Sequence, residues 1–281
     1  MSHNGRGRRR LGIALRLLLL TVGAAVMVLP FLYMVGTSFK PNAFLFEIPP
    51  KLVPDHPTTA NYAEAWSSNS FGRYFLNSTY VALSTTFVVL ALSATMAYAF
   101  ARFEFFGKNI LFGMLLAGLM IPGIIVIVPQ FVLADGLHLL NKLNGLVVFY
   151  AGGAVAFTTF LLRGFFERVP NDLDEAMTID GAGALRKFLR LYLPLARPAL
   201  ATAGILSFLG AWDEFVWALT IIDDPAKRTL PIAIAAFQGQ HGTAWGLVFA
   251  ASTIAIVPVI VVYVLGQRQF ISGITAGAVK D

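Results

Sequence analysis

The main pattern along the chain is a series of long apolar stretches in which charged residues are nearly absent. An α-helix needs about 20 consecutive apolar residues to cross the hydrocarbon core of a bilayer. The stretches that reach this length are Leu17–Phe39, Asn77–Ala101, Ile110–Gln130, Leu143–Leu162, Leu200–Ile222 and Ala244–Gly266. The pattern therefore predicts an all-α membrane protein with six transmembrane helices.

The composition supports a membrane location. Hydrophobic residues make up 57% of the chain and charged residues 13%, whereas soluble domains are about 25% charged. The chain has no cysteine, which excludes disulfides and thiolate chemistry. Because the four histidines lack the spacing of a metal motif, we expect neither a metal site nor a catalytic residue. They are His3, His56, His138 and His241.

The distribution of Lys and Arg predicts the orientation. With the N-terminus inside, the cytoplasmic segments hold 15 of the 21 basic residues and the outer segments hold 6, as the positive-inside rule requires. We expect both termini in the cytoplasm, and we attribute the net charge of +6 to loops near anionic lipid rather than to nucleic acid. The outer six are Lys40, Lys51, Arg73, Lys142, Lys227 and Arg228. No A-x-A-like cleavage site follows the first span, which we interpret as a retained anchor.

Proline and glycine predict where regular helix is interrupted. The outer loops 40–74 and 223–243 are too polar to span a bilayer and are expected to form turns and short helices. Pro122-Gly123 and Pro129 in the third span, and Pro258 in the sixth, are predicted kinks.

The cytoplasmic segment 164–198 is charged and helix-forming, although it lies between two apolar spans. Asp172 and Glu175 have capping-box spacing, which predicts a helix that begins near Asp172. Asp180-Gly181 should interrupt this helix, because glycine permits a sharp backbone turn and Asp180 can cap the helix that follows.

A second, amphipathic helix is predicted after Gly181. Four apolar residues recur at i, i+3, i+4 and i+7 and give this helix one apolar face, and Pro194 ends it. The four are Leu185, Phe188, Leu189 and Tyr192. Two interpretations stay open: a surface that docks a cytoplasmic partner, or an interfacial helix that lies on lipid headgroups.

Several short stretches match a known family in order and spacing. Segment 170–198 contains Glu175-Ala176-Met177, Asp180-Gly181-Ala182, Phe188 and Leu193-Pro194. It resembles the E-A-A-x-x-x-G loop of permease subunits from binding-protein-dependent ABC importers, with Met177 in place of the usual alanine. Further stretches are similar to the carbohydrate (maltose-type) branch of that family, with Asp213 where Asn is usual. They are Tyr74–Ser78, Ala211–Phe215 and Gln267–Lys280.

The resemblance implies the type I ABC importer permease fold in a single transmembrane domain, residues 1–281, with a family core at about 74–267. It implies a multi-pass protein of the bacterial plasma (inner) membrane that imports a sugar or oligosaccharide. The implied partners are a second permease subunit, a dimer of cytoplasmic ATPases and an extracytoplasmic solute-binding protein. The ATPase would dock on the loop 170–194. The implied docking residues are Glu175, Ala176, Asp180, Gly181, Ala182 and Phe188.

The chain itself carries no nucleotide-binding motif of the form G-x-x-x-x-G-K-[ST]. We therefore expect no cofactor in this chain and no enzymatic activity of its own. ATP and Mg²⁺ would be held by the partner ATPase, and the energy of hydrolysis would arrive through a mechanical contact that differs between inward-open and outward-open states.

A candidate substrate path lies in the fifth predicted span. An ionisable group at this depth costs about 2.5–3.5 kcal/mol on insertion scales, so Asp213 and Glu214 should face protein or water. Sugar sites pair polar groups with aromatic faces, which the neighbouring Trp212 and Phe215 could supply. The alternative is that both acidic residues are structural and bind a neighbouring helix or chain.

Three other functions fit the sequence less well. A membrane enzyme such as a lipid phosphotransferase is disfavoured, because Leu185 interrupts the D-G-x-x-A-R pattern after Gly181. A secondary transporter is disfavoured because no internal repeat is visible. Within the importer class, the alternative cargo is a polyol phosphate such as glycerol phosphate.

Overall fold

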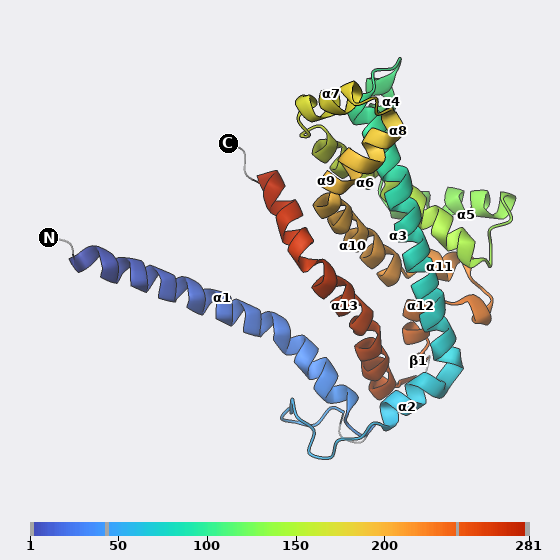
Figure 1. The fold of residues 1–281 in the computed structure, drawn as a ribbon. Coiled ribbons are helices and arrows are strands. Elements are labelled where there is room, and N and C mark those ends of the chain that lie inside the picture. The colour runs from blue at the N-terminus through green and yellow to red at the C-terminus, as the bar shows by residue number, and fades with distance from the viewer. Residues whose placement is uncertain (1–2, 43–44, 240–241, 279–281) are drawn as a thin grey trace. The chain divides into compact units, whose positions relative to one another are not determined.

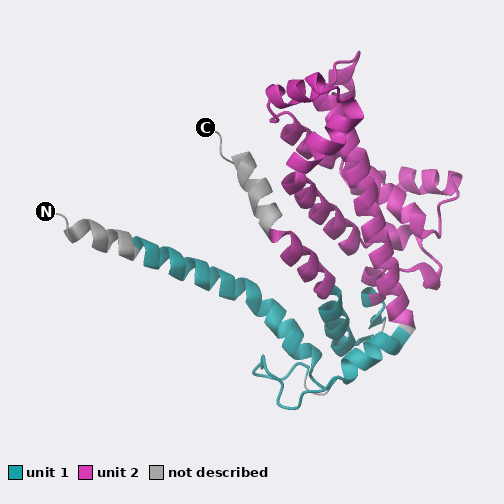
Figure 2. Cartoon of the chain, in the orientation of Figure 1, with its two compact units in different colours: residues 1–69, 234–255 teal, residues 70–233, 256–281 magenta. Residues whose placement is uncertain are grey.

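The computed structural model describes residues 3–42, 45–239 and 242–278. For residues 3–11, 69 and 268–278 it describes the backbone but not the side chains. It divides into two compact units, residues 1–69 with 234–255 and residues 70–233 with 256–281 (Figure 2). The prediction of a single domain stays a prediction. Some predictions fall outside the described residues: Lys280, and the side chains of the basic N-terminus and of the C-terminal tail after Gln267.

Unit 1 contains the first long helix, α1 (His3–Ser38), and the short helix α2 (Ala60–Ser67). Asn61 joins the two by donating its amide to the carbonyls of Ser38, at 2.9 Å, and Lys40, at 2.8 Å. The side chain of Lys40 is 1% exposed and pairs with Glu47 at 3.0 Å. Two short strands, β1 (Gln238–Gly239) and β2 (Gly242–Thr243), form an antiparallel pair. The expected turns and short helices of the outer loops are confirmed.

Unit 2 is built of helices (Figure 1). In chain order they are α3 (Phe71–Arg102), α4 (Lys108–Gly118), η3 (Gly123–Val126), α5 (Ile127–Gly136), α6 (Leu143–Phe166), α7 (Asn171–Ile179), α8 (Ala184–Lys187), η4 (Phe188–Tyr192), α9 (Leu193–Leu195), α10 (Arg197–Asp213), α11 (Val216–Ile221) and η5 (Pro225–Lys227). The helices α12 (Leu230–Ala235) and α13 (Trp245–Ala278) cross the boundary between the units.

Four helices in the described part of the chain are long and apolar enough to cross a membrane by themselves: α1, α3, α6 and α13. Two further crossings require a bent pair. The segments Lys108–Gly118 and Gly123–Gly136 meet at 92°, and Ala184–Leu195 and Arg197–Asp213 meet at 77°. The bend in the third span agrees with the kinks predicted there, whereas the predicted fifth span, 200–222, is not one helix, because α10 ends at Asp213 and α11 begins at Val216.

The prolines account for part of this difference. The kink predicted at Pro122-Gly123 is confirmed, because the chain breaks there between α4 and η3. Pro129 lies in the first turn of α5, where a backbone N–H would have no partner within that helix, so proline is tolerated there. Helix α13 continues through Pro258 without a break.

The core of unit 2 lies where α3 packs against α6 and α10 (Figure 1). Small side chains on the buried face of α3, among them Ser93, Ala94 and Ala97, allow the backbones to approach closely. The Ser93 hydroxyl also donates to the carbonyl of Val155 on α6 at 3.2 Å. These contacts make the three helices the frame that positions the rest of the unit.

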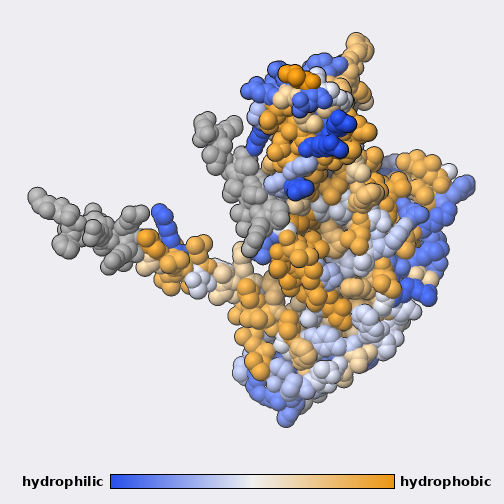
Figure 3. Space-filling view, viewed as in Figure 1, coloured by the Kyte–Doolittle hydropathy of each residue, from blue (hydrophilic) through white to orange (hydrophobic). Residues whose placement is uncertain are grey.

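The outward face of α3 remains apolar. Leu76, Leu83 and Phe87 are between 55% and 74% exposed, and Figure 3 shows hydrophobic residues along the helices and hydrophilic ones over α7 and α8. Exposed apolar surface on this scale is stable in lipid rather than in water.

The ends of unit 2 agree with the predicted sidedness. Asn77, near the start of α3, donates its amide to the carbonyls of Ala226, at 3.1 Å, and Arg228, at 2.9 Å. The side-chain carbonyl of Asn141 accepts the N–H groups of Asp223 and Asp224 at 2.7 and 2.9 Å. The outer segment 223–228 is thus bonded to the start of α3 and to Asn141, whereas the segment 170–194 contacts the other end of α3 through Tyr98.

Candidate functional site

The first helix of the candidate docking segment ends in a tight glycine turn. Gly181 has a φ of +74°, and its N–H donates to the carbonyl of Thr178 at 3.0 Å. The N–H of Ala182 donates to the carbonyl of Met177 at 2.8 Å. This pair of bonds is a Schellman motif, which satisfies carbonyls at a helix end and favours glycine at the left-handed position. The predicted interruption at Asp180-Gly181 is confirmed.

The predicted caps were wrong. Helix α7 begins at Asn171 after Pro170, with no side-chain capping bond, and Asp172 stands in its first turn. Gly183, not Asp180, precedes α8, again without a side-chain cap. The acidic first turn still suits the positive end of the helix dipole.

The second helix does not present one apolar face. A π-helical turn, η4, follows α8 and rotates the later residues relative to the expected spacing. Tyr192 is fully buried and Phe188 is half-buried, whereas Leu185 and Leu189 are 70% and 52% exposed. The four residues therefore divide between the bundle and the surface.

The candidate docking residues also divide. Glu175, Ala176, Asp180 and Gly181 are exposed in one short run, available to a partner. Ala182 is buried in the turn, so it stabilises the loop and is not part of the surface that a partner could contact. Phe188 is half-buried and packs against an apolar cluster that includes Tyr192, so it faces the bundle rather than a partner.

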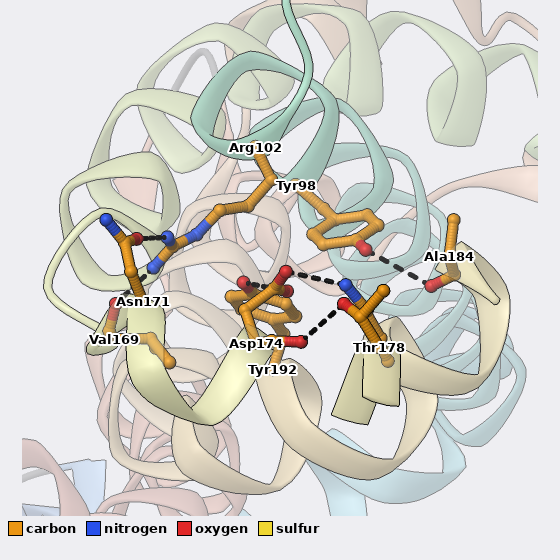
Figure 4. A network of polar contacts seen from close by, with 9 residues as sticks. Tyr98, Arg102, Val169, Asn171, Asp174, Thr178, Ala184 and Tyr192 are labelled. Carbon is orange, nitrogen blue, oxygen red and sulfur yellow. Dashed lines mark hydrogen bonds and ion pairs between the residues drawn. The ribbon is translucent and has the colours of Figure 1, made fainter. Parts of the chain in front are cut away.

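A polar clamp, which we define as Tyr98, Arg102, Asp174 and Tyr192, holds the segment to the bundle (Figure 4). Arg102, at the end of α3, donates to the carbonyl of Phe166 at 2.6 Å and also to that of Val169. These carbonyls lie at the last residue of α6 and shortly after it, where positive charge is favourable.

Arg102 reaches the first helix of the segment as well. Its guanidinium donates to the side chain of Asn171 at 2.8 Å and lies 5.0 Å from the centre of the Tyr192 ring. Tyr98, one turn earlier on α3, donates its hydroxyl to the carbonyl of Ala184 at 3.1 Å. The end of α3 therefore contacts both halves of the segment.

Asp174 ties the two halves to each other. Its carboxylate accepts a bond from Lys187 at 2.6 Å and one from the Tyr192 hydroxyl at 2.7 Å. Burial alone would raise the pKa of Asp174, but the bonds from Lys187 and Tyr192 outweigh it and hold the pKa below its ordinary value. The carboxylate is therefore charged at neutral pH.

An Asp174→Asn variant is expected to lose about 1–2 kcal/mol of stability, because charged hydrogen bonds to Lys187 and Tyr192 are removed. A lowered pKa stabilises the fold above the unfolded pKa of about 3.9, and this contribution disappears as the pH falls through the folded pKa. Thermal unfolding of both proteins in detergent from pH 8 to pH 3 would measure it. The difference should stay constant down to about pH 5; a difference that vanished near neutral pH would contradict the assignment.

Sequence reasoning missed the clamp. In the sequence, Arg102 is one of 15 basic residues in the cytoplasmic segments, and Tyr98 is part of the apolar stretch Asn77–Ala101. Nothing in their spacing points to segment 170–194, which lies far along the chain. The one available signal was an arginine placed directly at the predicted end of a span.

The candidate substrate path has a different geometry from the one expected. Helix α10 ends at Asp213 and α11 begins at Val216. Asp213 and Glu214 therefore lie at a break between two helices and not in the middle of a continuous one. Trp212 is buried and stacks with Phe208 at 5.6 Å, while Asp213 is exposed. Phe215 packs against a neighbouring apolar cluster.

Glu214 is the member of this group with a defined polar role. Its carboxylate accepts the N–H groups of Trp217 at 2.7 Å and Ala218 at 3.0 Å, which lack helical partners at the start of α11. It also accepts a bond from the Tyr150 hydroxyl of α6. The carboxylate therefore stabilises the break and joins it to α6.

Replacing Glu214 by Gln should destabilise the protein by about 1–3 kcal/mol. The amide nitrogen of Gln cannot accept a hydrogen bond, so at least one of the three donors would lose its acceptor. Glu214→Gln is expected to lower the melting temperature and the yield of the assembled complex. A control in which the exposed Asp213 is changed to Asn should leave both nearly unchanged. Unaltered stability of Glu214→Gln would show that the capping bonds contribute little.

A cavity of about 510 Å³ lies beside this break. Its wall combines aromatic, glycine and polar residues from α3, the third span, α6, α10 and α11. They are Thr85, Gly123, Ile124, Ile127, Gln130, Phe149, Tyr150, Gly153, Ala154, Leu206, Ser207, Gly210, Ala211, Glu214, Val216 and Trp217. Of the candidate path residues, only Glu214 lines it.

Comparison with known proteins identifies the family. Residues 88–275 match the family described as the inner-membrane component of binding-protein-dependent transport systems. The chain belongs to this family. The match overlaps most of the core expected at about 74–267, and the predicted permease fold and inner-membrane location are confirmed.

Curated members of the family are similar over nearly the whole chain. The diacetylchitobiose uptake system permease protein of Streptomyces coelicolor is 37% identical over 93% of this chain and 87% of its own length. The trehalose/maltose transport system permease protein of Thermococcus litoralis is 34% identical over 95% and 98% of the two chains.

A solved structure shows the same fold. One chain of a bacterial ABC transporter involved in import of the acidic polysaccharide alginate superposes with a TM-score of 0.82 at 23% identity. The superposition covers 94% of this chain and 98% of that one. At this identity the likeness establishes the architecture of the permease and not its cargo.

Proposed function

We propose that this permease carries a sugar or oligosaccharide into the cell as one subunit of an ATP-driven importer. The relatives named for diacetylchitobiose and for trehalose and maltose support the cargo class. The proposed partners are a second permease subunit, a dimer of cytoplasmic ATPases that holds ATP and Mg²⁺, and an extracytoplasmic solute-binding protein. Hydrolysis takes place on the ATPase, and this chain supplies no catalytic residue.

The observation that carries the coupling proposal is the clamped segment 170–194. It presents Glu175, Ala176 and Asp180 on its surface, while Arg102 and Tyr98 fix it to the end of α3. A rigid attachment of this kind transmits a push from below to the membrane helices, whereas a segment lying loosely on headgroups would not. The docking interpretation is therefore preferred to the interfacial one.

The cavity argues for a neutral cargo. Its wall contains the carboxylate of Glu214 and neither lysine nor arginine. A phosphate group is recognised by cationic side chains or helix N-termini, and here the start of α11 is already occupied by Glu214. A neutral sugar is therefore preferred to a polyol phosphate.

The test is ATPase stimulation in the purified, membrane-reconstituted complex. Diacetylchitobiose, maltose, trehalose and glycerol phosphate would be added separately with the solute-binding protein present. We expect at least one neutral sugar to stimulate hydrolysis and to be accumulated in proteoliposomes. Stimulation by glycerol phosphate alone would contradict the proposal, as would hydrolysis that no sugar changes.

A further inference from the structure

We propose that the last part of the cytoplasmic segment, residues 184–197, lies on the inner leaflet of the membrane and binds the phosphate groups of anionic phospholipids. Three arginines and three leucines form the surface concerned, which we define as the basic face: Arg186, Arg190, Arg197, Leu185, Leu189 and Leu195. The inference goes beyond the proposed cargo and coupling and rests on the membrane location of the family. Docking of the ATPase stays with the exposed run around Glu175.

The bend before α10 places this stretch near the plane of the membrane. Ala184–Leu195 and Arg197–Asp213 meet at 77°. Helix α10 packs against α3 and α6, which are long and apolar enough to cross a bilayer (Figure 1). A helix that is almost perpendicular to a membrane-crossing helix and joins its end runs along the membrane surface, at the depth of the headgroups.

The three arginines of the basic face are exposed and have no counter-charge within the described part of the chain. None of them makes an ion pair or a side-chain hydrogen bond with a residue that the structure describes. The carboxylate of Asp174 on α7 is bound by Lys187 at 2.6 Å instead, and the sequence has no acidic residue between Asp180 and Asp213. The guanidinium groups are therefore available to ligand oxygens, and phosphate matches their forked geometry.

The leucines of the basic face indicate a lipid rather than a soluble anion. Leu185, Leu189 and Leu195 are 70%, 52% and 49% exposed, whereas Phe188 and Tyr192 of the same stretch pack into the bundle. In an interfacial helix, apolar side chains enter the acyl boundary while cationic side chains reach the headgroups. Free phosphate would contact the arginines and leave the leucines in water.

The two halves of the segment differ in charge, which separates their partners. Helix α7 carries Asp172, Asp174 and Glu175 and no basic residue. Residues 184–197 carry four basic residues and no acidic one. The anionic inner leaflet attracts the second half and repels the first. Charge complementarity therefore assigns the basic face to lipid and leaves the surface of α7 to a protein partner.

Depth in the membrane can be measured at single cysteines, because the chain has no native cysteine. Leu189→Cys lies on the basic face, and Ala176→Cys lies on the exposed surface of α7. Each variant would carry a nitroxide in nanodiscs of phosphatidylcholine and phosphatidylglycerol in equal parts, without the ATPase. We expect the Leu189→Cys nitroxide to collide more with oxygen, which concentrates in lipid, and the Ala176→Cys nitroxide to collide more with a water-soluble nickel chelate. Addition of the ATPase should leave Leu189→Cys unchanged.

Lipid selectivity would be measured with variants that remove charge. Arg186→Gln combined with Arg190→Gln removes two charges from the basic face. The matched control, Arg73→Gln combined with Lys142→Gln, removes two exposed charges from the predicted outer side. A fluorophore on Leu189→Cys would be quenched by spin-labelled phosphatidylglycerol or, separately, by spin-labelled phosphatidylcholine. The ratio of the two quenching efficiencies reports the preference for anionic lipid.

Each arginine near an anionic surface strengthens binding about fivefold. We therefore expect the basic-face variant to lose affinity for phosphatidylglycerol about 25-fold, with no change in the control. An equal loss in both variants, or no loss in either, would overturn the proposal. So would a water-exposed Leu189→Cys, or shielding of that residue by the ATPase, which would assign the basic face to a protein. Displacement of phosphatidylglycerol by an equal concentration of inorganic phosphate would exclude the lipid as the ligand.

Discussion

A Gly181→Val variant is expected to reduce sugar uptake to about a tenth of the wild-type rate or less, since a loss of about 1.4 kcal/mol in coupling is tenfold. The reason is the φ of +74° at Gly181. A β-branched residue is strained there, at a cost of about 1–2 kcal/mol, and relief of the strain would unwind the turn between α7 and α8. Uptake per ATP hydrolysed in proteoliposomes is the measurement.

The adjacent loop offers a close control. Gly183 is exposed and has a φ of −70°, and a Cβ atom there would meet nothing within 4 Å. Gly183→Val adds the same side chain to the same surface without the backbone strain. If both variants lose uptake equally, the effect comes from bulk at the docking surface and not from the turn.

Replacing Arg102 by Ala is expected to weaken attachment of the segment 170–194 by about 3 kcal/mol, because charge-assisted hydrogen bonds are each worth about 1.5–3 kcal/mol. The carbonyls of Phe166 and Val169 would lose the guanidinium donor, and Tyr192 would lose the cation over its ring. We expect the purified complex to hydrolyse ATP while sugar accumulation falls. Hydrogen exchange should rise in α7 and α8.

Arg163→Ala is the matched control. Arg163 lies near the same end of α6, pairs with Glu167 at 2.7 Å and stacks on Phe112. An ion pair at this spacing is worth about 0.3–0.5 kcal/mol, and the cation–π contact adds about 0.5–1 kcal/mol, so the total stays well below the loss expected for Arg102→Ala. Loss of the Arg163 side chain should leave transport close to the wild-type value. Wild-type uptake in Arg102→Ala, with unchanged exchange in α7, would show that the clamp does not transmit force.

The sequence alone determined the membrane class, the six apolar stretches and the segment that interrupts them. These follow from local properties: the length of an apolar run, the position of basic residues and the glycine turn at Gly181. The family resemblance of this segment, rather than its local properties, implied the exposed run around Glu175 that we propose as a docking surface. The exposure of this run depends on α7 and the glycine turn after it, both of which are specified by neighbouring residues.

The tertiary structure decided which of these residues act together. Arg102 meets Asn171 across 69 positions of the chain, and Tyr150 meets Glu214 across 64. Hydropathy reports how well a residue suits lipid or protein, but not which distant group will complete its hydrogen bonds. The break after Asp213 also escaped prediction. Glu214 caps the new helix through local bonds, and the hydroxyl of Tyr150 on α6 adds a third bond across 64 positions of the chain. The clamp and the cavity exist because long helices bring far-separated polar groups together where lipid offers them no other partner.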